Sequence, residues 1–465
     1  MSEIFDNLYH MTALSDLIGD PSFLLMYGIA FLLLYLGIVK HYEPLLLVPI
    51  AFGVLIANFP GGDMGVLQAN EIGEIFRYTI DNQSHTLVLT NAIKDMDGVI
   101  AAGGNPADYM QVGTYFYSLA DNPVLRNLTP GMIDVKNVWE MPIHDVAHEF
   151  GIMNFLYYSL IKTGFLPPVI FMGVGALTDF GPMLRNLRLA IFGAAAQLGI
   201  FTVLLAAVAL GFTLKEAGSL GIIGGADGPT AIFTTIKLAP HLLGPIAIAA
   251  YSYMALVPVI IPLVVKLLCT RKELMINMKE QDKLYPNKTE IKNMRAIKII
   301  FPIAVTTIVA IFVPTAVSLV GMLMFGNLLK EIGSDTSRLF NTVSNGMMNT
   351  CTVFLGLCVG ATMTSAAFLN WTTIGIVIGG FLAFALSISG GIFMVKLVNL
   401  FSKKKINPLI GATGLSAVPM ASRVCNEIST KYDPKNHVLN YCMSSNISGV
   451  IGSAVAAGVL ISFLQ

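Results

Sequence analysis

The stretch that decides the fold is Gly221-Ile-Ile-Gly-Gly-Ala-Asp-Gly-Pro-Thr-Ala-Ile-Phe233. Four glycines and Pro229 cannot lie within one continuous helix, because glycine costs about 1 kcal/mol and proline about 3 kcal/mol in a helix interior. Asp227 stands at this break, between apolar residues on both sides. Broken helices inside a membrane are tolerated only where the freed carbonyl groups line a cavity or contact protein. The stretch therefore predicts a site inside a membrane protein.

The composition of the whole chain agrees with this interpretation. The 465 residues are 55% hydrophobic and only 12% charged, whereas soluble domains carry about 25% charged residues. This much apolar surface requires lipid as its solvent, which excludes a soluble enzyme. The 28 basic and 28 acidic residues cancel, so we expect no nucleic-acid partner.

We predict an all-α polytopic membrane protein with about ten transmembrane helices. Residues 1–20 are expected to form an amphipathic helix at the membrane interface, and residues 21–60 the first transmembrane helices. The expected spans are 22–39, 44–59, 150–166, 188–211, 243–268, 299–315, 316–329, 340–368, 371–400 and 438–463.

A polar insert over residues 61–149 separates the second and third spans. It holds twelve Asp or Glu residues against four Lys or Arg residues. Its content of glycine, proline and asparagine suggests short helices and loops. We interpret the insert as an extracytoplasmic cap or subunit contact.

Charge in the short loops predicts the orientation of the chain. Residues 271–298 carry eight Lys or Arg residues, so this basic loop is expected in the cytoplasm, between a first half at 150–270 and a second half at 299–465. Segment 218–237 must then enter and leave from the outside, and segment 407–423 from the cytoplasm. Two broken segments entering from opposite faces are typical of inverted-repeat transporters.

The chemistry expected of the first broken segment centres on Asp227. A carboxylate at the bilayer centre costs roughly 2.5–3.5 kcal/mol on insertion scales, which favours a functional role. Together with backbone carbonyls and the Thr230 hydroxyl, it would offer the oxygen ligands that hard cations prefer. An alternative stays open, in which Asp227 only caps the half-helix that begins near Pro229.

The second broken segment reads Asn407-Pro-Leu-Ile-Gly-Ala-Thr-Gly-Leu-Ser-Ala-Val-Pro-Met-Ala-Ser-Arg423. It offers the neutral oxygens of Asn407, Thr413 and Ser416, and Arg423 suits an anion near the cytoplasmic surface. Helix packing by small residues and an Arg that reaches the interface are the alternatives.

Polar residues also occur in two of the expected spans. Tyr253, in Tyr251-Ser-Tyr253, suits a hydrogen bond to a carboxylate or a proton relay, and an interfacial aromatic belt is the alternative. Asn446 and Ser453 lie in the last span. Hydrogen bonding between helices would also explain these two residues.

The motif Gly-Gly-Ala-Asp-Gly-Pro-Thr-Ala-Ile at 224–232 resembles the signature of the membrane beta subunit of sodium-pumping biotin-dependent decarboxylases. This family includes oxaloacetate, methylmalonyl-CoA and glutaconyl-CoA decarboxylases, and the length of the chain is most similar to the oxaloacetate type. The resemblance extends over nearly the whole chain, through Thr178–Leu184, Ala249–Pro258, Phe325–Leu329, Asn407–Arg423 and Gly449–Gly458.

The resemblance implies a mechanism, partners and a location. An alpha subunit would transfer CO2 from its substrate to biotin and present carboxybiotin to this chain from the cytoplasm. Decarboxylation here would consume a proton and drive Na⁺ outward. A small membrane gamma subunit, further copies of this chain, and the bacterial inner membrane are the implied surroundings.

The resemblance also implies roles for seven residues of this sequence. The catalytic residues would be Asp227, Tyr253, Ser416 and Arg423. Carboxybiotin would be bound by Arg423, Asn407 and Asn446. Na⁺ would be bound by Asp227, Asn407, Gly411, Ser416 and Asn446. The chain departs from the family at Ser444-Ser445, where Gly-Pro is usual before the last of these asparagines.

Two other classes of protein compete with this interpretation. A secondary sodium symporter or exchanger would show the same broken helices and need no biotin partner. A non-catalytic membrane anchor would need neither Asp227 nor the two broken segments. The sequence contains no Walker A motif, which argues against an ATP-driven pump.

Overall fold

The computed structural model describes residues 17, 20–41, 44–62, 64–66, 75–80, 83–89, 93, 96–101, 105–112, 115–128, 133–134, 143–286, 293–369 and 371–464. The interfacial helix predicted at 1–20 lies outside these residues, apart from Leu17 and Asp20. Most of the described chain is helical, as predicted for a polytopic membrane protein.

Six segments of the described chain are helical, long and apolar enough to span a membrane. They are α3 (Pro21–Ile38), α9 with α10 (Leu187–Ala196 and Leu198–Ala209), α17 (Met294–Phe312), η8 with α18 (Pro314–Ala316 and Val317–Ile332), α22 (Trp371–Phe401) and α25 (Leu439–Leu464). Two bent pairs raise the number to eight. The first joins α6 and η5 (Ile143–Leu156 and Tyr157–Ile161) to α7 (Leu166–Leu177), and the second joins α13 (Leu243–Ala255) to α14 (Val257–Leu268).

The described residues therefore give six to eight candidate spans, and about ten were predicted. Helix α4 (Pro44–Ala57) has only 14 residues, and the segment expected at 340–368 is divided among α19 (Ser337–Asn341), η10 (Thr342–Met347), α20 (Met348–Ala361) and α21 (Ser365–Phe368). A helix rises 1.5 Å per residue, so 14 residues are too few to cross the hydrocarbon core upright. Ten spans are not confirmed, and the inverted repeat stays a prediction.

The insert contains β-strands, which corrects the expectation that the chain is all-α and that the insert consists of short helices and loops. Strand β1 (Ile75–Ile80) pairs antiparallel with β2 (Gln83–Val88) and β5 (Ile133–Asp134), and β3 (Tyr109–Val112) pairs with β4 (Tyr115–Ser118). Among the described residues of the insert, α5 (Met96–Ala101), η1 (Pro106–Asp108), η2 (Pro123–Asn127) and the start of α6 are helical. The predicted short helices are present, but the strands were missed, because β-branched and aromatic residues within these runs favour strands over the surrounding turn residues.

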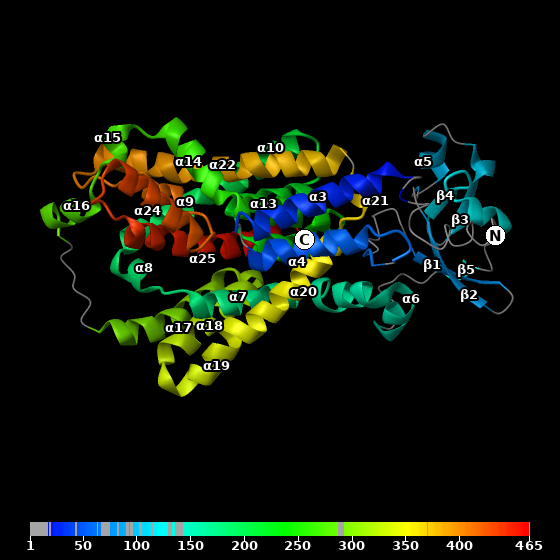
Figure 1. Cartoon of the computed structure of the whole chain (residues 1–465), viewed down its shortest axis with the longest axis horizontal. Helices are drawn as coiled ribbons and strands as arrows, with labels where there is room; N and C mark the ends of the chain where they lie inside the picture. Colours follow the sequence, from blue (N-terminus) through cyan, green and yellow to red (C-terminus); the bar gives the residue numbers. More distant parts are fainter. Residues whose placement is uncertain are drawn as a thin grey trace.

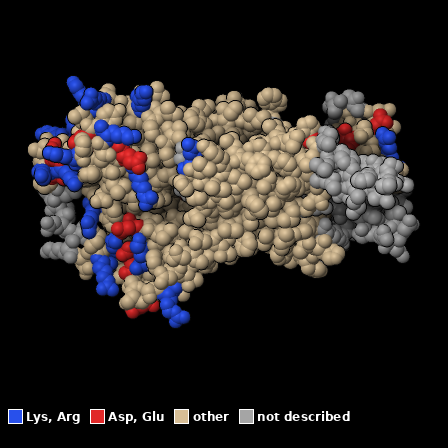
Figure 2. Space-filling model, viewed as in Figure 1, with Lys and Arg blue, Asp and Glu red and all other residues tan. Residues whose placement is uncertain are grey.

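Charged residues gather at the two ends of an elongated bundle. The insert lies at one end, and α15 (Arg271–Leu274), α16 (Met278–Leu284) and α24 (Met420–Tyr432) lie at the other (Figure 1). On the face shown in Figure 2, Lys and Arg side chains gather at the α15–α16 end, and the middle of the bundle is mostly uncharged. This basic end contains most of the loop 271–298, which its excess of Lys and Arg predicts to be cytoplasmic.

Glycines let the helices of the bundle approach closely. A Cβ built at Gly175 of α7 would lie 1.8 Å from the Leu323 carbonyl oxygen of α18, and one at Gly326 would lie 1.9 Å from the Met172 carbonyl oxygen. Small residues at such contacts are the usual basis of helix packing in lipid, where no hydrophobic force drives helices together. The remaining helical elements are α8 (Gly181–Arg185), α11 (Leu214–Gly221), η6 (Ile222–Gly225), α12 (Gly228–Leu238), η7 (Pro240–Leu242), η9 (Ser334–Thr336) and α23 (Leu409–Ala412).

Candidate cation site between the two broken segments

The first broken segment has the interruption that its glycines and proline predict. Helix α11 ends in the short 3-10 helix η6, and Ala226 then adopts a left-handed conformation with φ of 55°. Asp227 is extended, and α12 begins at Gly228 with proline in its first turn. Residues 222–227 thus separate two helices at a buried position.

The second broken segment meets the first at its own interruption. Helix α23 ends at Ala412 and α24 begins at Met420, so residues 413–419 form the break. The Ser416 backbone N–H donates to the Gly225 carbonyl oxygen at 3.0 Å. The two predicted breaks are therefore in direct contact, although Asp227 and Ser416 are 189 residues apart in the sequence.

The Asp227 carboxylate uses its two oxygens differently. Oδ1 accepts from the Thr230 backbone N–H at 3.2 Å, which confirms the capping interpretation. Oδ2 accepts from the hydroxyl groups of Ser416 at 2.7 Å and Ser453 at 2.8 Å. Capping therefore explains only one carboxylate oxygen, and the other brings together both broken segments and the last helix.

No Lys, Arg or His within the described ranges forms an ion pair with Asp227. The residue is only 5% exposed. A buried carboxylate with no countercharge is costly, so it must either bind a cation or take up a proton. Hydroxyl and carboxylate oxygens are the ligands that hard cations such as Na⁺ prefer.

Two further oxygens at this position are buried and have no hydrogen-bond partner among the described residues. They are the Thr230 Oγ1 and the Tyr251 hydroxyl. The Tyr251 ring covers the residue after Asp227, because a Cβ built at Gly228 would lie 2.0 Å from the ring carbon Cε1. Both groups are therefore available to a bound cation or its water.

Tyr253, which the resemblance favoured, faces a different part of the core. Its hydroxyl donates to the Val377 carbonyl oxygen of α22, and its ring packs against Phe381 and Phe384. Residues two positions apart on a helix point to nearly opposite sides. Only one of the two tyrosines can therefore face Asp227, and in this structure it is Tyr251.

The other predicted site residues are divided between the break and more distant positions. The Asn446 amide donates to the Leu415 carbonyl oxygen and accepts from the Ser422 hydroxyl at 3.2 Å, so it supports the break beside Ser416. Asn407 instead donates to the carbonyl oxygens of Leu274 at 2.9 Å and Ile276 at 3.1 Å, at the basic end.

Two predicted residues also lie away from the carboxylate. Gly411 packs α23 onto α22, because a Cβ there would lie 2.1 Å from the Gly391 carbonyl oxygen. Arg423 is exposed on α24. Of the residues predicted from sequence, the structure thus joins Asp227 and Ser416 directly, with Asn446 beside them.

The sequence analysis noted Ser453 only as a polar residue of the last span. In the structure its hydroxyl donates to Asp227 Oδ2. The sequence carried a signal for this, because Ser453 follows Asn446 by seven residues. That spacing puts both side chains on one face of a helix, two turns apart.

Comparisons with known proteins agree with this geometry. The family model of the Na⁺-transporting oxaloacetate decarboxylase beta subunit matches residues 22–464. The chain belongs to this family. The resemblance noted in the sequence is therefore confirmed.

Named relatives of two kinds are about equally similar to this chain. The oxaloacetate decarboxylase beta chain 2 of Salmonella typhi is 42% identical, covering 95% of this chain and 94% of that protein. The oxaloacetate decarboxylase beta chain of Klebsiella pneumoniae is 41% identical over the same shares. The methylmalonyl-CoA decarboxylase subunit beta of Propionigenium modestum is also 41% identical, over 98% of each chain. The identity of this chain to these relatives therefore does not show whether its complex uses oxaloacetate or methylmalonyl-CoA.

The two tyrosines can be distinguished by matched substitutions. We expect Tyr251→Phe to lower the apparent Na⁺ affinity about tenfold, because a bound cation would lose one oxygen ligand, an effect that we take as similar in size to one hydrogen bond to a charged group. Tyr253→Phe, whose hydroxyl binds Val377, should change it less than about threefold. Both are measured as the Na⁺ concentration for half-maximal activity of the purified complex. A larger effect of Tyr253→Phe would contradict the assignment of Tyr251.

Proposed function

We propose that this chain is the membrane subunit of a Na⁺-translocating decarboxylase that cleaves carboxybiotin delivered by a partner and exports Na⁺. The observation that carries the proposal is the Asp227 carboxylate, buried at the junction of two broken segments without a cationic partner among the described residues. A site of this kind can alternate between a bound cation and a proton. Membership of the Na⁺-transporting decarboxylase family supports the proposal that decarboxylation drives this exchange of cation and proton.

In this proposal Asp227 is ionised while Na⁺ is bound and takes up a proton when Na⁺ leaves. Ser416 and Ser453 hold the same carboxylate oxygen from two different elements. A movement of either element would therefore change the ligands of the cation and open the site toward one face. Tyr251 and Thr230 contribute further oxygens beside the carboxylate.

Arg423 is proposed to receive the carboxylate of carboxybiotin at the cytoplasmic side. It is exposed on α24, an element of the basic end of the bundle (Figure 1). A guanidinium group binds a carboxylate through two parallel hydrogen bonds. Cleavage of the N–C bond releases CO2, and the biotin nitrogen then takes one proton, so each turnover consumes a proton.

The proposal includes the surroundings of the chain. The basic loop 271–298 faces the cytoplasm, and the insert 61–149 lies outside the inner membrane of a bacterial cell. An alpha subunit supplies the carboxyltransferase and the biotin, and a small gamma subunit and further copies of this chain complete the assembly. The oxaloacetate type is the first candidate, and the alpha subunit determines which acid is used.

A transport assay with avidin tests this function against a symporter or an anchor. The complex is purified from its native membranes and reconstituted, and ²²Na⁺ uptake is followed after adding oxaloacetate, methylmalonyl-CoA or glutaconyl-CoA. We expect one of these acids to drive uptake and avidin, which binds biotin, to abolish it. A matched sample uses avidin already saturated with biotin.

Two outcomes would contradict the proposal. Sodium uptake that avidin leaves unchanged would indicate a symporter or exchanger. Acid-driven uptake that persists in a complex from which this chain is missing would indicate an anchor.

A further inference from the structure

An open groove lies between α10 and α22, away from the two broken segments' junction, and reaches α15 at the basic end of the bundle. Helices α10 and α22 are in contact along the groove, and α22 extends along one edge of the bundle toward α15 (Figure 1). The volume of the groove is about 1010 Å³, whereas pockets for small molecules measure roughly 300–1,000 Å³. The groove can therefore hold a large ligand.

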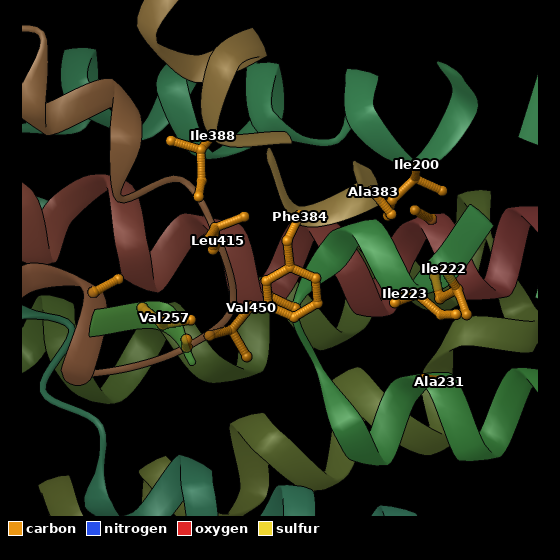
Figure 3. Packing of buried hydrophobic residues seen from close by; sticks show 14 of the residues in the cluster. Ile200, Ile222, Ile223, Ala231, Val257, Ala383, Phe384, Ile388, Leu415 and Val450 are labelled. Atoms are coloured by element: carbon orange, nitrogen blue, oxygen red, sulfur yellow. The ribbon is translucent and has the colours of Figure 1, made fainter. Parts of the chain in front are cut away.

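Helix α22 has apolar residues on two opposite faces. Phe384 and Ile388 are completely buried in the core (Figure 3). The groove is lined from another face, by residues that include positions 386, 390, 393, 397 and 400. This spacing of three or four residues aligns side chains along one side of a helix. Phe393 and Leu397 are each at least half exposed, so this second face is open to lipid.

Gly390 leaves space in the groove that helix packing does not use. A Cβ built at Gly390 would lie 3.5 Å from the Ala195 carbonyl oxygen and 3.9 Å from the Leu198 Cβ, which are ordinary contacts. The next residue differs, because a Cβ at Gly391 would lie 2.0 Å from the Gly411 carbonyl oxygen. Gly391 is therefore needed for packing, whereas Gly390 could carry a side chain that fills the groove.

Three lysines line the α15 end of the same groove. Lys396 is neutralised, because its Nζ forms an ion pair with Glu273 at 3.1 Å. Lys272 and Lys405 are exposed, and neither forms an ion pair within the described ranges. Lys405 Nζ donates to the Asn399 carbonyl oxygen at 2.6 Å, which leaves its charge in place. Two uncompensated positive charges thus stand at the end of an apolar groove.

We propose that this groove binds an anionic phospholipid, with its phosphate at Lys272 and Lys405 and an acyl chain along Gly390 and Phe393. Basic pockets between transmembrane helices bind anionic lipid headgroups, and lysines near a membrane surface attract such lipids. A free phosphate would use the lysines but not the apolar face, and an apolar helix of a partner would leave both charges unpaired. A phospholipid matches both ends. The inference does not depend on the proposed sodium transport.

The test is a titration of the delipidated, purified complex with phosphatidylglycerol or phosphatidylcholine of identical acyl chains, with bound lipid counted by native mass spectrometry. We expect tighter binding of phosphatidylglycerol. Lys272→Gln combined with Lys405→Gln should weaken it about thirtyfold, since each lysine near the surface contributes about fivefold, and should leave phosphatidylcholine unchanged. Size-exclusion chromatography verifies the assembly of each variant.

Two lysines of α16 supply the matched control. Lys279 and Lys283 are exposed at the same basic end but do not line the groove. Lys279→Gln combined with Lys283→Gln removes the same charge and should keep the preference for phosphatidylglycerol. An equal loss in this control would show a general effect of surface charge and overturn the site, and so would an unchanged preference in the Lys272 and Lys405 variant.

Gly390→Leu tests the acyl-chain part of the groove without changing any charge. We expect it to weaken both lipids at least about tenfold, because displacing two methylene groups from apolar contact already has this effect. Leu397→Trp, at an exposed position of the same face, serves as the second variant if Gly390→Leu fails to assemble. Unchanged lipid binding together with loss of a partner subunit would show that the groove receives a protein helix, which would overturn the proposal.

Discussion

Asp227→Asn should abolish sodium transport and carboxybiotin decarboxylation while the chain still folds and assembles. Asparagine caps helices almost as well as aspartate, so the hydrogen bond from the Thr230 backbone N–H to this side chain can persist. The negative charge that would balance Na⁺ is lost, and the side chain can no longer exchange a cation for a proton. We expect both activities to fall at least about a hundredfold, since charged hydrogen-bond partners contribute roughly 1.5–3 kcal/mol each.

The measurement is acid-driven ²²Na⁺ uptake by the reconstituted complex, with size-exclusion chromatography to verify assembly. Asp20→Asn is the matched control, because Asp20 caps α3 by accepting from the Ser22 backbone N–H at 2.9 Å. That variant should transport at the normal rate. Near-normal transport by Asp227→Asn would show that its carboxylate serves only as a helix cap.

The combination of Ser416→Ala and Ser453→Ala should have the second largest effect. Both hydroxyls donate to Asp227 Oδ2, so each single variant leaves this oxygen with one donor and the double variant leaves it with neither. We expect roughly tenfold lower Na⁺ affinity in each single variant and at least a hundredfold in the double variant. The affinity is taken from the Na⁺ dependence of turnover.

Ser448→Ala supplies the control on the same helix. The Ser448 hydroxyl donates to the carbonyl oxygens of Ala190 and Ser445, both at 2.8 Å, and not to Asp227. Its loss should leave the Na⁺ affinity within about threefold of normal. If Ser453→Ala behaved like Ser448→Ala, the last helix would not belong to the cation site.

Features that depend on neighbouring residues could be predicted from the sequence. The apolar composition indicated a membrane protein, and the glycines and Pro229 located the first break. The capping role of Asp227 was also predictable, because a cap acts over three residues. The motif around Asp227 was specific enough to identify the family.

Where only weak local signals exist, the predictions were less successful. The strands of the insert were missed, because turn residues dominated its composition. About ten spans were predicted and six to eight candidates occur among the described residues, because an apolar sequence alone does not show where a helix bends or stops, as it does between α13 and α14.

Tertiary structure alone decided which polar groups meet at the site. The sequence resemblance favoured Tyr253, and only the packing of α13 shows that Tyr251 is the tyrosine turned toward Gly228. Ser453 reaches Asp227 across 226 residues, and Ser416 reaches it across 189. Helix breaks and caps follow from the backbone chemistry of adjacent residues, so one sequence predicts them. Contacts between distant helices depend on how those helices pack, and no local pattern in the chain encodes that arrangement.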